Sequence, residues 1–263
     1  MGLSGRRDAA TVVLLREGSE HDDPGGGLEV LLLGRPAASR FAPGAEVFPG
    51  GSVDPSDAAP GWRQLSAGRA RDAAVAPRIM IAAVRETFEE CGVLLARDGS
   101  GRSCPPQLLA GLAGLRQLIH DGHPEEFQGG LSRAGLRPAW EDLAFCAHWV
   151  TPAGMSRIFD TRFFLAALPA GQQAQPDAGG ELASMRWVEP AQALKEAELG
   201  RCLLLPPTRS VLAQLTAPPT VAAALAAARA TRVRRVRPEL ADITTERYPG
   251  LDLEAIRPSD GSR

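Results

Sequence analysis

The chain has 263 residues, with 29 basic and 31 acidic side chains and a formal net charge of −2. This length is enough for one large domain with its own hydrophobic core. The near-neutral balance gives no broad electrostatic basis for binding nucleic acid or a membrane surface.

Cysteine usage and the first residues bear on the compartment. The four cysteines show no Cys-x-x-Cys spacing, so neither a zinc site nor a disulfide framework is predicted. Residues 1–8 are polar and unlike a signal peptide, and the alanine-rich stretch 221–230 is too short to span a bilayer. We therefore expect a cytoplasmic protein with no nucleic-acid or membrane partner. The basic run 232–237 is interpreted as the exposed face of a helix end.

The first elements in chain order are two apolar runs, residues 10–16 and 28–33. A Gly- and Asp-rich stretch separates them, which predicts a hairpin-like pair of strands. Residues 55–72, rich in Ala, Gly and Pro, are expected to form an insertion of loop character.

A helix is predicted next, over residues 77–95. Pro77 suits its first position and Gly92 lies near its end. Apolar residues recur at helical spacing along one side, namely Ile81, Val84 and Phe88.

The rest of the chain alternates between helical and strand patterns. Helices are predicted at 107–119, 125–136, 190–199, 208–215 and 220–230, strands at 144–150, 158–168 and 185–188, and loops at 98–105 and 169–180. The first two helices are interpreted as a small cap, with His120 and His123 flanking a loop and given no metal role. Strands interspersed with helices predict a mixed sheet held between helices.

Three glutamates mark the helix at 77–95. Glu86, Glu89 and Glu90 are three and four residues apart, so they can share one face. Acids this close repel one another unless a cation lies among them, and oxygen ligands suit Mg²⁺ or Mn²⁺. Arg85 is placed to hold Glu86 by charge-assisted hydrogen bonds. Taken alone, such a run is also typical of a solvated helix face.

The order of two segments adds to this pattern. Phe48-Pro49-Gly50-Gly51 precedes the acidic helix, and Gly92-Val93 follows it. Together they resemble the Nudix box of the Nudix hydrolases, which reads glycine, distal acid, then Arg-Glu-apolar-x-Glu-Glu-x-Gly-apolar. Thr87 stands in an apolar place. Asp57 is the candidate distal acid, with Asp54 as its rival.

The spacing within the box departs from the family. Residues 58–84, 27 in all, separate Asp57 from Arg85, where the family has seven. An insertion therefore splits the box.

A second resemblance concerns the substrate. Before the box, the chain follows the spacing of the motif found in coenzyme A diphosphatases of this superfamily, with departures at Leu33 and Pro36. Stretches resembling the subgroup with long insertions are 149–152, 159–164 and 205–208. We expect a Nudix hydrolase domain over 1–215, with insertions at about 55–76 and 98–141. A C-terminal helical extension and tail are expected over 216–263.

The resemblance implies a fold and an activity. The fold would be an α/β/α sandwich around a mixed, partly closed sheet. The activity would be metal-dependent hydrolysis of a nucleoside diphosphate linked to X, with coenzyme A or acyl-CoA as the leading small-molecule substrate. ADP-ribose or another nucleotide sugar is the alternative, and a non-catalytic Nudix-like nucleotide sensor is the alternative of another class. A homodimer is left open.

The resemblance also implies roles for individual residues. Glu89 and Glu90 would hold Mg²⁺ or Mn²⁺, with Glu86 as a further ligand or as the base that takes a proton from water. Arg85 would orient Glu86. The backbone carbonyl of Gly50 or Gly51 would complete the metal shell. Glu181, with Asp177 behind it, is the candidate for a further acid from a loop.

Substrate contact is expected from the motif before the box. Arg35 and Arg40 bracket a loop beside Gly50 and Gly51, and the planar guanidinium suits phosphate oxygens. The alternative is that both arginines are solvated loop charges or pair with acids nearby, Glu29 and Glu46.

Overall fold

A mixed sheet runs through the molecule. The computed structural model describes residues 5–18, 27–39, 42–65, 75–155, 157–176 and 182–244. Within them the main path of the sheet is β10 (Leu203–Leu204), β3 (Ala45–Val47), β2 (Leu28–Gly34), β1 (Arg6–Glu17), β8 (Ile158–Ala167), β7 (Ala144–Val150) and β11 (Arg235–Val236). Off this path, β4 (Gly50–Ser52) pairs with β1, and β9 (Ser184–Val188) pairs with β2.

The pairing divides β1 into two halves. Its end is antiparallel to β2, with Leu15 opposite Val30, whereas its beginning is antiparallel to β4, with Thr11 opposite Gly50. On the other side β1 runs parallel to β8 along most of its length. The glycine-rich strand β4 therefore lies at an opening of the sheet, next to the ends of β2 and β3.

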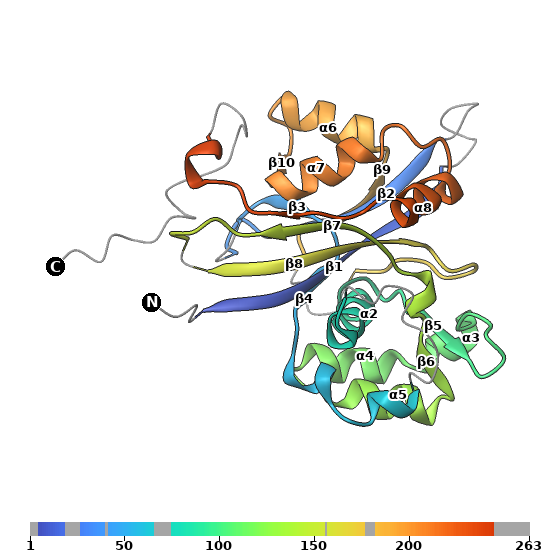
Figure 1. Cartoon of the computed structure of the whole chain (residues 1–263). Coiled ribbons are helices and arrows are strands. Elements are labelled where there is room, and N and C mark those ends of the chain that lie inside the picture. The colour runs from blue at the N-terminus through green and yellow to red at the C-terminus, as the bar shows by residue number, and fades with distance from the viewer. Residues whose placement is uncertain are drawn as a thin grey trace.

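Helices cover both faces of this sheet (Figure 1). On one face lie α2 (Pro77–Cys91), α4 (Ala113–His120) and α5 (Glu126–Arg133). On the other lie α6 (Pro190–Glu198), α7 (Pro206–Gln214) and α8 (Val221–Ala230). The shorter elements are η1 (Pro55–Ala58), α1 (Trp62–Leu65), β5 (Ala96–Asp98), α3 (Pro106–Ala110), β6 (Leu136–Pro138), η2 (Trp140–Asp142) and η3 (Leu240–Asp242). The predicted sandwich of helices around a mixed sheet is confirmed.

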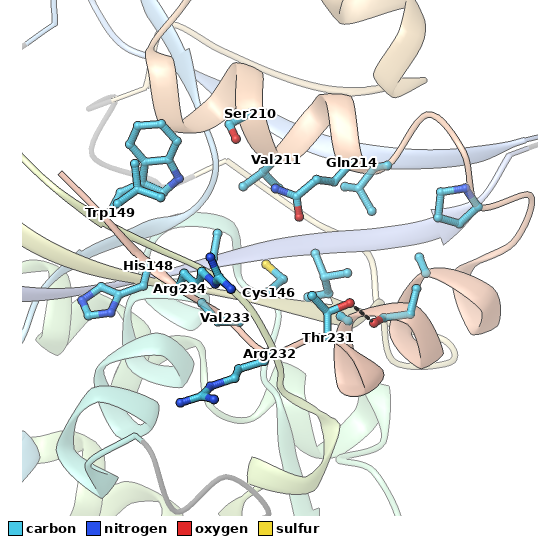
Figure 2. A pocket seen from close by; sticks show the side chains of 18 residues that line it. Cys146, His148, Trp149, Ser210, Val211, Gln214, Thr231, Arg232, Val233 and Arg234 are labelled. Atoms are coloured by element: carbon cyan, nitrogen blue, oxygen red, sulfur yellow. Dashed lines mark hydrogen bonds between the residues drawn. The ribbon is translucent and has the colours of Figure 1, made fainter. Parts of the chain in front are cut away.

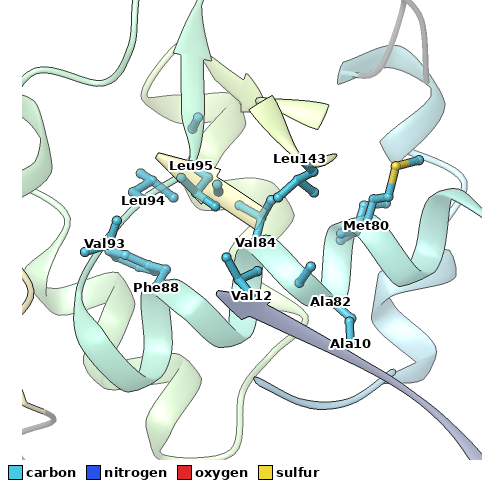
Figure 3. Close-up of a cluster of buried hydrophobic side chains, with 14 of the residues drawn as sticks. Ala10, Val12, Met80, Ala82, Val84, Phe88, Val93, Leu94, Leu95 and Leu143 are labelled. Atoms are coloured by element: carbon cyan, nitrogen blue, oxygen red, sulfur yellow. The ribbon is translucent and has the colours of Figure 1, made fainter. Parts of the chain in front are cut away.

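Alternation along β1 supplies both cores, because successive side chains of a strand point to opposite faces. Ala10 and Val12 pack with Val84 and Phe88 of α2 (Figure 3). Val13 and the other β1 residues whose side chains point to the same face pack instead against α6, α7 and α8. A strand buried on both faces reads as a continuous apolar run, as this one does.

The acidic helix begins at Pro77 as predicted, but it ends at Cys91 and not at residue 95. Pro77 is its first residue, and Gly92, with a φ of 69°, closes it in the left-handed conformation that glycine adopts most readily. Thr87, in the apolar place of the box, is fully buried, and its hydroxyl donates to the Ala83 carbonyl at 2.7 Å. The local hydrogen bond lets a polar side chain occupy this core position.

Several predicted elements need correction. Residues 107–119 form α3 and α4 rather than a single helix, because the chain leaves the helix at Gly111. The loop at 98–105 begins on β5, which pairs with β6 in a small second sheet. The basic run 232–237 is not a helix end, since Arg235 and Val236 form β11 beside β7. Strands of two or three residues carry too little pattern to be predicted locally.

The C-terminal helices belong to the core. Val221, Ala224 and Ala228 of α8 are buried against the face of the sheet that α7 also covers. No helix in the described part of the chain combines the length and the apolar character that crossing a bilayer requires.

Candidate active site

The predicted glutamates and the glycine strand lie side by side. The backbone N–H of Gly50 donates to Glu90 Oε2 at 2.8 Å. The next residue, Gly51, lies so close to Glu86 that a Cβ there would be 2.5 Å from the carboxylate carbon. Only a residue without a side chain fits at Gly51, so the glycine there lets the backbone of β4 come up to the acids.

Arg85 is the centre of the polar network beneath these acids. Its Nε and one terminal nitrogen bind the two carboxylate oxygens of Asp57, both at 2.9 Å. The other terminal nitrogen donates to Glu86 Oε1 at 2.9 Å and lies 3.4 Å from Glu89 Oε2. Arg85 therefore holds Glu86 as predicted.

The structure also decides between the two candidate distal acids. Asp57 and Arg85 are only 1% and 3% exposed, so their pair is shielded from water. Asp54 instead accepts a hydrogen bond from the backbone N–H of Ser56 and caps η1. Asp57 is the partner of the box arginine, in spite of the insertion between them.

Charge and burial shift the ionisation of the network. Burial raises the pKa of Glu86 above its ordinary value, although the adjacent Arg85 guanidinium opposes the shift. Burial also raises the pKa of Glu90 well above its ordinary value, and the charge of Glu86 adds to this. For Arg85, burial would lower the pKa, but the hydrogen bonds to Asp57 and the charge of Glu86 raise it overall. The acids thus repel one another around an arginine that stays charged.

Two adjoining cavities open onto the acids. The first, about 480 Å³, is lined by all three glutamates with Arg35, Val47 and His120, and we call it the acid cavity. The second, about 540 Å³, shares Glu86, Glu89 and His120 and extends past Asp54; we call it the side cavity. The glutamates therefore face open space and not a packed interface.

A third cavity lies across the glycine strand. This aromatic pocket, about 280 Å³, is lined by Gly50 and Gly51 and by residues from the stretches that resemble the coenzyme A-associated subgroup, among them Trp149, Thr151, Phe159, Leu205 and Thr208. Arg35 and Val47 line both this pocket and the acid cavity. The two cavities thus meet at the end of β2.

Arg35 is oriented by the fold toward the acids. Its backbone N–H donates to the Ala45 carbonyl at 2.9 Å, which ties the residue to β3. Its charge acts on Glu90, where it opposes the rise of the carboxyl pKa. The acids proposed as alternative partners are engaged elsewhere: Glu29 binds Arg16 at 2.7 Å, and Glu46 binds Arg186 at 2.7 Å.

The insertion after the box contributes one residue that the sequence did not single out as functional. His120, the last residue of α4, lines both the acid cavity and the side cavity. It belongs to no recognised motif, and its approach to Glu86 and Glu89 arises only from the packing of α4 on α2. The apolar spacing that predicted the helix was the sole available signal.

The carboxylates fit a hard divalent cation by chemistry. Three of them line one cavity, and the negative charge of Glu86 adds to the burial that raises the pKa of Glu90, a charge that a bound cation would offset. Within the described residues, however, no three His, Cys, Asp or Glu side chains already converge as a closed metal site. In this structure Arg85 and Gly50 instead donate to the carboxylates. Glu181, Asp177 and Arg40 lie outside the described residues.

One further cavity, about 530 Å³, holds none of these acids. It lies on the opposite face of the sheet among β7, α7 and α8, with Arg232 and Arg234 beside mostly apolar walls (Figure 2). His148 lines it but bonds Asp160 Oδ1 at 2.6 Å through its Nε2. The acid cavity therefore remains the candidate site.

Comparisons with known proteins agree with this site. A model of the NUDT19 Nudix domain matches residues 6–77 and 71–215. The acyl-coenzyme A diphosphatase NUDT19 of Gallus gallus is 30% identical over 248 residues, covering 76% of this chain and 65% of that protein. The Homo sapiens protein of the same name is 29% identical, covering 78% and 67%. This chain therefore spans about two thirds of the length of these two relatives.

A solved structure extends the comparison to the fold. The crystal structure of a NUDIX hydrolase from Alicyclobacillus acidocaldarius superposes with a TM-score of 0.69 at 30% identity. The match covers 86% of this chain and 97% of that one. The shared architecture thus includes nearly all of the other chain.

Proposed function

Because this chain belongs to the NUDT19 family of Nudix domains, we propose that it is a metal-dependent hydrolase that cleaves the diphosphate of coenzyme A or an acyl-CoA. The names of two relatives, acyl-coenzyme A diphosphatases, support this choice of substrate. All three box glutamates are present and line a cavity, which supports catalysis over a non-catalytic sensor.

One observation carries the proposal: the acid cavity and the aromatic pocket meet at Arg35 and Val47. A diphosphate in the acid cavity would have an arginine fork within the same space, which suits its oxygens. The organic group attached to it would extend past Arg35 into the aromatic pocket. A substrate with a bulky group on its diphosphate uses both spaces, whereas a bare phosphate uses only the first.

The residues would divide the work as follows. Glu89 and Glu90, with the Gly50 carbonyl, would hold Mg²⁺ or Mn²⁺, as expected for oxygen donors. When bound, the cation supplies a lowered pKa for coordinated water and offsets charge on the phosphates. Glu86 would be a further ligand or the base that accepts the proton of the attacking water, and Arg85 keeps this carboxylate oriented. Arg35 and Gly51 would contact the diphosphate. Glu181 would supply a further acid, and Arg40 would be a further substrate contact.

The experiment is an assay of the purified chain with Mg²⁺ and, separately, Mn²⁺. Free coenzyme A, an acyl-CoA and ADP-ribose are supplied, and the products are identified by mass. Hydrolysis of the coenzyme A diphosphate should release adenosine 3′,5′-bisphosphate together with phosphopantetheine or its acyl form. A matched variant, Glu89→Gln, controls for contaminating activity.

The outcomes separate the proposed function from its alternatives. Faster turnover of ADP-ribose than of either coenzyme A species would transfer the assignment to a nucleotide-sugar pyrophosphatase. Tight binding of these nucleotides without turnover of any of them, with either metal, would instead establish a sensor.

A further inference from the structure

We propose that the helical insertion completes the phosphate site and that His120 contacts the diphosphate of the substrate. The inference rests on the proposed function, because it takes the acid cavity as the place of the diphosphate. It assigns a substrate contact to the insertion at 98–141, for which no such contact is predicted from the sequence.

The insertion is fixed to the acidic helix by Arg116 of α4. Its Nε donates to the carbonyl of Glu89 at 2.9 Å, and a terminal nitrogen donates to the carbonyl of Glu90 at 3.1 Å. Carbonyls in the last turn of a helix lack intrahelical partners, so a cation there satisfies them. Arg116 is thus a positioning residue that locks α4 onto the backbone of two proposed metal ligands.

Apolar packing supports the same placement. Leu115 and Ile119 of α4 are buried in the core that includes Phe88 of α2. His120 follows Ile119 directly and is half-buried. The side chain therefore belongs to an ordered helix end held on two sides, not to a free surface loop.

The position of His120 relative to the acids points to a phosphate contact. Of the described residues of the insertion, His120 alone lines both the acid cavity and the side cavity. Arg35 and His120 are the nitrogen-bearing side chains among the described residues that line the acid cavity. The three glutamates that line the same cavity have only acceptor oxygens when ionised.

The charges of the substrate require such donors. A diphosphate brings further negative oxygens into a cavity that already holds three carboxylates. Hydrogen bonds to charged oxygens are the strong ones, and an imidazole offers an N–H at one ring nitrogen even when neutral. Arg35 and His120 are therefore placed to donate to a diphosphate in the acid cavity.

The test compares His120→Ala and His120→Gln with a matched control, His123→Ala. His123 is three residues along, bonds Glu125 at 3.2 Å, and lines neither cavity. The value of kcat/KM for coenzyme A should fall about ten- to hundredfold in His120→Ala, mainly through KM, as loss of a charged hydrogen bond predicts. The glutamine variant keeps an N–H donor and should recover part of the loss. The control should match the wild type.

A measurement of Mn²⁺ affinity distinguishes a phosphate contact from a metal ligand. Mn²⁺ affinity should be equal in the wild type and His120→Ala, because the inferred contact is to phosphate. Equal kinetics for His120→Ala and His123→Ala, or a loss of Mn²⁺ affinity in proportion to activity, would overturn the inference.

Failure of the proposed function can be distinguished from failure of the inference about His120. If the wild type cleaves no coenzyme A species, calorimetry with inorganic pyrophosphate and Mg²⁺ still tests the contact. Weaker pyrophosphate binding by His120→Ala than by His123→Ala would support it, and equal binding would refute it.

Discussion

Asp57 and Arg85 form a buried, two-pronged ion pair, with both N–O distances at 2.9 Å, although 27 residues (58–84) separate them in the chain. The two halves of the split box therefore meet in space, in spite of the insertion between them. The pair also holds Arg85 so that its other terminal nitrogen donates to Glu86. A structural contact thus supports the orientation of the proposed base.

Removing Asp57 should therefore cost more than removing Asp54. In Asp57→Ala, Arg85 would keep its charge in a buried place without its main partner, which typically costs about 3–5 kcal/mol. In Asp54→Ala only the cap of η1 is lost, which costs about 0.5–2 kcal/mol. Urea denaturation of both variants measures the difference. Equal free energies of unfolding would show that the ion pair contributes nothing beyond the cap.

Substitutions of the two glycines of β4 should have different effects, one mainly on turnover and the other mainly on stability. Gly51→Ala places a Cβ 2.5 Å from the Glu86 carboxylate carbon, so the acid must move, and we expect loss of turnover with modest loss of stability. Gly50→Ala instead drives its Cβ into the backbone of Ala10 and Thr11, so the strand pairing must break and the melting temperature should fall.

Gly114→Ala is the matched control for both glycine variants. This residue is exposed within α4, and a Cβ there meets nothing within 4 Å. Replacing glycine by alanine in a helix should leave turnover unchanged and add about 0.5–1 kcal/mol of stability. Wild-type turnover in Gly51→Ala would contradict the close approach of β4 to Glu86.

Features that are signalled by residues close together in the chain could be predicted from the sequence. The acidic helix was predictable because Pro77, the buried stripe and the closing Gly92 are local signals, although its predicted end at residue 95 lies beyond the observed end at Cys91. Gly111 also marked a break within the predicted helix at 107–119, but the recurring leucines favoured one continuous helix. Of these, Leu118 is 42% exposed, so apolar spacing there did not mean burial.

Contacts between distant segments were not predictable. The choice of Asp57 over Asp54 depends on where the chain returns after the insertion. The approach of His120 to the acids depends on the packing of Leu115 and Ile119, which no motif records. Likewise β11 is a strand only because β7 offers its edge.

Divalent cations should stabilise the protein more at pH 8 than at pH 5. Burial raises the pKa of Glu86 and of Glu90 above the ordinary value of 4.5. The metal-free folded state then binds protons more tightly than the unfolded state, so stability is lost as pH rises through the raised folded pKa values. Mg²⁺ removes this loss by binding the ionised carboxylates, and protons compete with it at pH 5.

The measurement is the melting temperature with Mg²⁺ or with EDTA across this pH range. In Glu90→Gln, which cannot ionise at that position, the melting temperature in EDTA should depend less on pH. A Mg²⁺-induced shift of equal size at pH 5 and pH 8 would argue that the cation binds away from these carboxylates.

Substituting the box glutamates one at a time should separate ligands from base. Glu89→Gln and Glu90→Gln remove charge from the proposed cation site, so both Mn²⁺ affinity and kcat should fall, with the fold intact. If Glu86 acts as the base, Glu86→Gln should lower kcat about 10²–10⁴-fold while Mn²⁺ affinity changes little. Glu126→Gln is the control, because its carboxylate is exposed and pairs only loosely with Arg133, at 3.6 Å. An unchanged kcat in Glu89→Gln would refute its assignment as a ligand, and a large loss of Mn²⁺ affinity in Glu86→Gln would make Glu86 a ligand as well, since a residue that only accepts a proton has no reason to hold the cation.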